Sequence, residues 1–174
     1  MIFRLPVLIL MCILFVPACN SGTESAGGGR KPGAGEMAEL NRYLVKKDRE
    51  RILNYIERKE LEMHETGSGL WYMIRSEGSG ELFRENDHVI MEYRCTLLDG
   101  TFCYSSEDSG PMEVIVGKSR IESGLDQGLR MLRPGGSAVL ILPPFLAWGF
   151  PGDGKKIPSN AVVVYEIEKV SLRN

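Results

Sequence analysis

Residues 88–106 read HVIMEYRCTLLDGTFCYSS and carry the strongest structural signal in the chain. Their first ten side chains alternate between two faces, and one face carries Val89, Met91, Tyr93, Cys95 and Leu97. Alternation with a period of two is typical of an antiparallel strand that buries one face. The Asp99-Gly100 pair that follows is a strong hairpin signal, so a second strand is expected to return along the first.

Shorter runs with the same period lie on both sides of this hairpin. They span residues 70–75, 112–116, 138–142 and 161–167. Residues 124–132 have helical spacing instead, because Leu125, Leu129 and Leu132 share one face and Pro134-Gly135 follows. A sheet with one short helix on its concave face predicts an α+β domain.

A charged segment precedes the sheet. Residues 37–63 are rich in helix formers and contain no glycine or proline, so they predict a helix within an N-terminal helical segment, residues 37–66. Its narrow apolar stripe consists of Leu40, Leu44, Ile52, Ile56 and Leu61. The stripe either packs on the domain or binds a partner, such as a second copy or another component of an envelope complex.

The first 18 residues form an export signal. They are nearly all apolar, with Arg4 as the only charge, and the apolar core is too short to span a bilayer. The junction Val16-Pro17-Ala18-Cys19 resembles a bacterial lipoprotein signal, which implies that acyl chains anchor Cys19 in a membrane. The alternative is an ordinary secretory signal with an incidental cysteine.

A tether is expected between this anchor and the helical segment. Residues 19–36 are rich in Gly and Ser and show no periodicity, which is typical of a flexible linker. Asn20 stands where an aspartate would signal retention in the inner membrane of enterobacteria. We therefore expect the protein in the cell envelope, on the periplasmic face of the outer membrane.

Charge and composition limit the functional classes. The chain has 21 Lys and Arg against 23 Asp and Glu, so nucleic acid is not an expected partner. The two histidines, His64 and His88, are far apart and predict no metal site, and no nucleophile or phosphate-binding motif occurs. What remains is a set of aromatic and aliphatic side chains beside tight turns, which could form a core or a binding pocket.

The order of the motifs resembles the FKBP-type peptidyl-prolyl isomerases over residues 69–172. The resemblance rests on Tyr93, Leu98-Asp99-Gly100-Thr101, Gly124-Leu125-Asp126-Gln127-Gly128, Ala147-Trp148-Gly149 and Ile157-Pro158. It implies an isomerase domain at residues 67–174, with a strongly curved antiparallel sheet wrapped around the 124–132 helix. The anchored layout is similar to gliding-motility-associated FKBP lipoproteins. This resemblance implies an enzyme that acts on proline-containing clients and helps exported proteins fold without a cofactor.

The resemblance also assigns roles within a proline pocket. It implies catalytic positions at Tyr93, Tyr104, Glu122 and Trp148, with Glu122 acting through its backbone N–H. It implies substrate-binding positions at Cys103, Met112, Ile121, Leu125, Ile157 and Tyr165. Leu125 would form the floor in place of the family's usual tryptophan, and Trp148 could offer only its indole N–H as a donor.

Three further positions depart from the family pattern. Cys103 and Tyr104 replace the usual Phe-Asp pair, and Cys95 replaces a glycine. The missing aspartate predicts weakened turnover, so the runner-up function is a proline-binding chaperone or assembly lipoprotein with little or no activity.

The length of the hairpin loop decides how the two cysteines are paired. A three-residue hairpin loop would pair Cys95 with Cys103 and permit a disulfide, whereas a two-residue loop would pair Cys95 with Tyr104. Two buried free thiols are the alternative to the disulfide.

Overall fold

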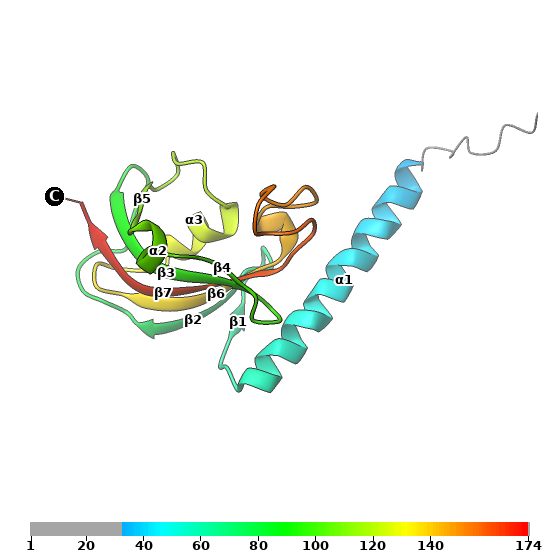
Figure 1. The fold of residues 1–174 in the computed structure, drawn as a ribbon, viewed down its shortest axis with the longest axis horizontal. Coiled ribbons are helices and arrows are strands. Elements are labelled where there is room, and N and C mark those ends of the chain that lie inside the picture. Colours follow the sequence, from blue (N-terminus) through cyan, green and yellow to red (C-terminus); the bar gives the residue numbers. More distant parts are fainter. Residues whose placement is uncertain (1–32, 174) are drawn as a thin grey trace, which may run out of the picture.

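The computed structural model of the chain describes residues 33–173, so the signal segment, Cys19 and residues 19–32 of the tether lie outside the described residues. The helices are α1 (Ala34–Lys59), α2 (Ser106–Ser109), α3 (Ser123–Leu129) and a 3-10 turn, η1 (Pro144–Leu146). The strands are β1 (His64–Glu65), β2 (Trp71–Ser76), β3 (His88–Leu97), β4 (Phe102–Ser105), β5 (Met112–Ile115), β6 (Ser137–Leu142) and β7 (Val163–Leu172). The predicted α+β class is confirmed, as Figure 1 shows.

All strands join one antiparallel sheet in the order β1-β2-β6-β7-β3-β4, with β5 also paired to β3. Strand β3 is the long segment of alternating side chains, and it pairs with β7 along almost its whole length. Helix α3 lies against one face of this sheet (Figure 1). Its leucines Leu125 and Leu129 are completely buried, as is Leu132 just beyond its end.

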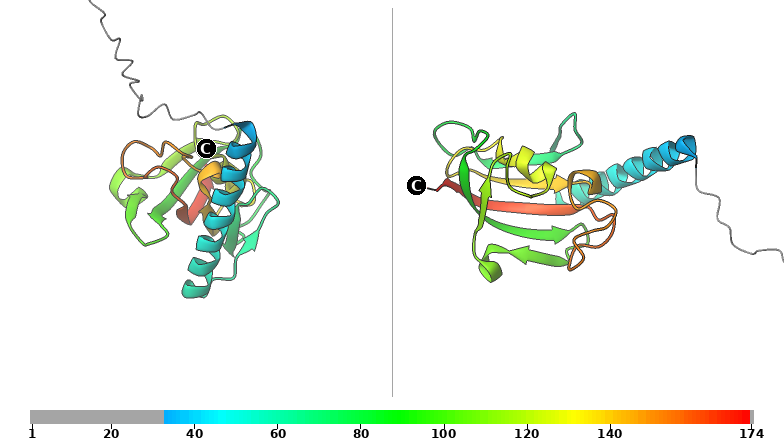
Figure 2. Two further views of the ribbon diagram at one scale, coloured as in Figure 1. Left: turned by 90° about the vertical axis from the view of Figure 1, so that its right-hand side faces the viewer. Right: turned by 90° about the horizontal axis from the view of Figure 1, so that it is seen from above.

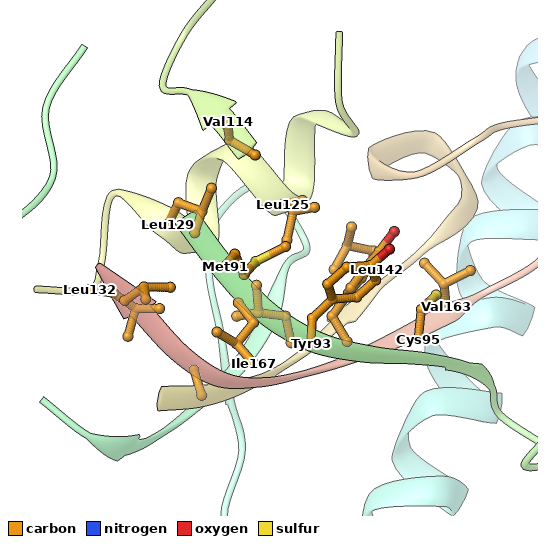
Figure 3. Packing of buried hydrophobic residues seen from close by; sticks show 14 of the residues in the cluster. Met91, Tyr93, Cys95, Val114, Leu125, Leu129, Leu132, Leu142, Val163 and Ile167 are labelled. Carbon is orange, nitrogen blue, oxygen red and sulfur yellow. The ribbon is translucent and has the colours of Figure 1, made fainter. Parts of the chain in front are cut away.

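The sheet separates two hydrophobic cores. The larger core lies on the α3 side and contains Met91, Tyr93, Leu125, Leu142 and Ile167, which are labelled in Figure 3. The smaller core lies between α1 and the opposite face. Consecutive residues of β7 serve different cores, because Val164 belongs to the smaller one and Tyr165 to the larger one. This is the period-two geometry of a strand buried on both faces.

Helix α1 begins and ends earlier than the predicted span of 37–63. It starts at Ala34, within the predicted tether, because the Glu36 carboxylate accepts a hydrogen bond of 2.8 Å from the Gly33 N–H and caps the first turn. It ends at Lys59, because Glu60 adopts a left-handed conformation (φ 52°). The predicted helical segment 37–66 is therefore wrong at its end, where His64 and Glu65 form β1 and pair with β2.

Only the second half of α1 docks on the sheet. Ile52 and Tyr55 are buried against the smaller core, and the guanidinium of Arg49 lies 5.6 Å from the Trp71 ring centroid. In the first half Met37 and Leu40 are 43% and 47% exposed, so this part of the apolar stripe has no partner within residues 33–173. Figure 2 shows this end of the helix projecting beyond the sheet. No helix among the described residues is both long enough and apolar enough to cross a membrane.

Candidate functional site

The candidate site is built on the α3 side of the sheet. Strand β3 supplies Tyr93 and strand β7 supplies Tyr165, and their ring centroids are 5.8 Å apart. Leu125 of α3 and Ile157 of the loop before β7 belong to the same buried cluster. We call these four residues the aromatic site. The structure thus brings together side chains that are separated by as many as 72 positions in the sequence, from Tyr93 to Tyr165.

Glu122 reaches this site with its side chain as well as its backbone. The residue is the N-cap of α3, but its carboxylate makes no capping hydrogen bond. Instead, Glu122 Oε1 accepts a hydrogen bond of 2.5 Å from the Tyr165 hydroxyl, and only 6% of Glu122 is exposed. Burial, together with the nearby Cys95 and the Glu122 carboxylate, raises the pKa of the Tyr165 phenol. The family resemblance assigned Glu122 to the site for its amide alone and gave no sign of the buried carboxylate.

The Tyr93 hydroxyl is an available donor in this site. Burial, with smaller contributions from Cys95 and Glu122, raises the pKa of Tyr93, so its phenol stays protonated at neutral pH. No hydrogen bond joins this hydroxyl to another group within residues 33–173, although every fully buried polar side-chain atom there has a partner. The Tyr93 hydroxyl is therefore reachable by solvent or by a ligand.

The loop between η1 and β7 forms the exposed side of the site. Trp148 is 40% exposed and Phe150 is 79% exposed, whereas Ile157 is only 2% exposed. Asp153 organises this loop by accepting hydrogen bonds of 2.8 Å from the N–H groups of both Lys155 and Ile157.

Tyr104 joins this loop to β4. Its hydroxyl donates a hydrogen bond to the Asp153 carboxylate, and the Lys156 ammonium lies 5.2 Å from its ring centroid. Burial opposes ionisation of Asp153, but the hydrogen bonds from Tyr104 and from the loop N–H groups outweigh it and lower the pKa of the carboxyl. The phenol of Tyr104 is thus engaged in holding the loop.

Comparison with known proteins identifies the domain. Residues 80–170, more than half of the chain, match the model of the family described as FKBP-type peptidyl-prolyl cis-trans isomerase. The chain belongs to this family. The predicted FKBP resemblance is therefore confirmed.

The matches to individual relatives span only part of each relative's length. The probable FKBP-type peptidyl-prolyl cis-trans isomerase FkpA of Neisseria meningitidis is 36% identical over 108 residues, which are 62% of this chain and 39% of that protein. Peptidyl-prolyl cis-trans isomerase FKBP10 of Homo sapiens is 40% identical over 97 residues, 55% of this chain and 16% of that protein. The chain thus matches less than half of the length of these two curated relatives.

Solved structures show the same FKBP fold. The crystal structure of AtFKBP13 matches with a TM-score of 0.57 and 28% identity, over 62% of this chain and 96% of the other. FkpA from Escherichia coli matches with a TM-score of 0.59 and 24% identity, over 82% of this chain and 75% of the other. These matches confirm the predicted curved sheet that wraps around a short helix.

The two cysteines of this FKBP domain are fully buried free thiols in the structure. The hairpin has the predicted bulged loop, because the Leu97 N–H donates to the Thr101 carbonyl at 2.9 Å and Gly100 has φ 89°. The inference that Cys95 pairs with Cys103 in the strand register is wrong, because a second irregularity places Cys95 opposite Tyr104. Both thiols nevertheless lie in the same buried cluster, on the α3 side of the sheet. Burial raises the pKa of both thiols, which keeps them protonated and weakly nucleophilic.

The remaining FKBP site positions lie at the border of the same core. Met112 on β5 and Ile121 before α3 are half-buried and pack against the cluster that contains Cys103, Leu125, Ile157 and Tyr165. Trp148 is the most exposed of the predicted site residues and lies just after η1. Of these assignments, Tyr104 differs most from expectation, because its hydroxyl already has a partner.

Proposed function

We propose that this protein is a peptidyl-prolyl cis-trans isomerase that assists the folding of exported proteins at the bacterial envelope. The observation that carries the proposal is the aromatic site of an FKBP domain, in which buried apolar side chains lie beside the Tyr93 hydroxyl, a donor that has no hydrogen-bond partner within residues 33–173. Rotation about a prolyl amide needs no nucleophile, metal or cofactor from the protein. It needs a site that binds the twisted amide better than the planar one.

The geometry suits that requirement. A planar amide is polar, and its rotation barrier is about 18–20 kcal/mol because resonance must be lost. Apolar walls at Tyr93, Leu125 and Ile157 replace water around the prolyl ring and favour the less polar twisted form. The Tyr93 hydroxyl and the Glu122 N–H, neither of which donates a hydrogen bond within residues 33–173, can fix the peptide carbonyl groups on either side.

The test is the rate of cis-to-trans isomerisation of a short peptide with leucine before proline. We expect the purified protein to accelerate a step that otherwise takes tens to hundreds of seconds. The acceleration should increase linearly with the protein concentration. Cooperative unfolding of the same sample would show that the protein is folded. If such a sample did not accelerate the isomerisation, the proposed enzymatic activity would be excluded.

The runner-up function is proline-dependent binding without efficient turnover. It is favoured by the absence of a carboxylate at position 104 and by the engagement of Tyr104 with Asp153. In a proline-limited refolding assay, an isomerase accelerates the slow phase, whereas a pure binder leaves it unchanged or slows it. The same assay therefore separates the two functions.

The envelope location rests on the sequence of the first 20 residues. A cysteine that follows Val16-Pro17-Ala18 supports acylation at Cys19, and Asn20, which stands where an aspartate would signal retention in the inner membrane, supports anchoring at the periplasmic face of the outer membrane. The exposed apolar side chains Met37 and Leu40 on the projecting half of α1 support a partner in an envelope complex.

Replacement of Cys19 by alanine is expected to release the protein from membranes. Each buried acyl methylene contributes about 0.8 kcal/mol, so losing the acyl chains removes most of the free energy of membrane binding. Fractionation of cells that express each form would show the wild type in the membrane pellet and the variant outside it. Retention of Cys19→Ala in the pellet would contradict the lipid anchor.

A further inference from the structure

The carboxylate of Glu122 is buried, and no cationic side chain among residues 33–173 is paired with it. Only 6% of the residue is exposed. A buried carboxylate is costly unless hydrogen bonds or an opposite charge compensate for the lost water. Here the compensation consists of one neutral donor, the Tyr165 hydroxyl, and the partial positive charge at the start of α3.

One oxygen of this carboxylate remains available. Tyr165 donates to Oε1, while Oε2 accepts no hydrogen bond within the described residues. Since every fully buried polar side-chain atom of those residues has a partner, Oε2 must retain some exposed surface, as must the Tyr93 hydroxyl. Tyr165 links the two groups, because its hydroxyl donates to Glu122 and its ring centroid lies 5.8 Å from that of Tyr93.

The aromatic site therefore presents a free acceptor with a negative charge beside a free hydroxyl. Both residues are more than nine-tenths buried, so a cationic group that reaches Oε2 loses part of its water and meets the carboxylate in a weakly screening environment. A purely structural role in orienting Tyr165 would need only one neutral acceptor oxygen. The charge and the second oxygen are left without a role in the fold.

We propose that Glu122 makes the site selective for polypeptide segments in which a cationic side chain, Lys or Arg, directly precedes the proline. This inference rests on the proposed proline-binding function and names its substrate class. A lysine or arginine can bring a charged donor to Oε2 on a flexible stem, and such charge-assisted hydrogen bonds are stronger than neutral ones. An acidic residue at the same place meets like charge and is disfavoured.

The experiment compares Lys-Pro, Leu-Pro and Glu-Pro peptides of otherwise identical sequence, with the wild type and with Glu122→Gln. Glutamine keeps the shape of the side chain and an acceptor for the Tyr165 hydroxyl, but it removes the charge. We expect kcat/KM for Lys-Pro to exceed that for Glu-Pro by about tenfold or more in the wild type, equivalent to about 1.4 kcal/mol. In Glu122→Gln this ratio should approach one, while the Leu-Pro value changes less than the Lys-Pro value.

A matched control is Glu81→Gln, which removes the same charge at a surface carboxylate that is 78% exposed and paired with Arg84. The Lys-Pro to Glu-Pro ratio should stay at the wild-type value in this variant. An unchanged ratio in Glu122→Gln, or an equal loss in Glu81→Gln, would overturn the proposal.

The selectivity for Lys-Pro and the isomerase function can be disproved separately. If the wild type accelerates no peptide, the enzyme is excluded, and the same peptide series is then compared by its dissociation constants from the wild type and from Glu122→Gln. Tighter binding of Lys-Pro that depends on Glu122 supports the selectivity in a binding module. Equal binding of the three peptides contradicts it.

Discussion

Replacement of Trp148 by alanine is expected to lower kcat/KM for prolyl isomerisation by about tenfold or more, a loss of about 1.4 kcal/mol or more in transition-state stabilisation. Trp148 is 40% exposed and lies just after η1, in the loop that also supplies Ile157 to the aromatic site. Its loss removes apolar surface that excludes water from the prolyl ring. The measurement is the peptide isomerisation assay on the purified variant.

Phe145→Ala is the matched control for this substitution. Phe145 is 51% exposed and lies in η1, but it contacts Gly69 and faces the Arg49 and Trp71 region beside α1. Its removal takes away a similar exposed aromatic ring outside the aromatic site, and kcat/KM should stay within about twofold of the wild type. If kcat/KM fell equally in the two variants, or did not fall in Trp148→Ala, the prolyl-binding surface would have to lie elsewhere.

Gly152→Ala is expected to lower both stability and activity. Gly152 has φ 69°, and an added Cβ would lie 2.4 Å from the Ile157 carbonyl oxygen and 2.7 Å from the Pro158 carbonyl carbon. These are backbone atoms, so the loop must open to admit the methyl group. We expect the free energy of unfolding to fall by about 2–3 kcal/mol. Activity should fall as well, because Asp153 and Ile157 move with the loop.

Gly154→Ala separates strain from steric conflict. Gly154 has a similar φ of 71°, but an added Cβ would meet nothing within 4 Å. It should therefore show only the conformational cost, about 1 kcal/mol, and retain activity. Chemical denaturation and the peptide assay check both variants. If Gly154→Ala lost as much activity as Gly152→Ala, loop strain rather than the contact with Ile157 and Pro158 would explain the effect.

Local patterns predicted the sheet and the position of its central helix. Alternation in residues 88–97 identified β3, and the leucines at 125 and 129 identified α3, because periodicity reflects which side chains are buried. The bulged hairpin at Gly100 was also readable from Asp99-Gly100. The predicted end of the N-terminal helix was less accurate. The left-handed conformation of Glu60 and the strand pairing of His64 depend on the sheet against which the chain turns, and the local sequence does not show that sheet.

The polar chemistry of the site could not be predicted in the same way. The Glu122–Tyr165 and Tyr104–Asp153 hydrogen bonds join residues 43 and 49 positions apart, and no local pattern relates such pairs. The predicted pairing of Cys95 with Cys103 was wrong for a related reason. A second irregularity beyond the turn altered which residue is paired with Cys95, and the Asp99-Gly100 turn signal does not predict such an irregularity.

The position of α1 has a consequence for how the molecule can be used. The helix covers the face of the sheet opposite the aromatic site, and its first half extends past the domain without a partner among residues 33–173. In Figure 1 this projecting half rises beside η1 and the loop that follows it. A second molecule that bound it would use side chains of α1 that take no part in the aromatic site, and it would lie next to the loop that carries Ile157.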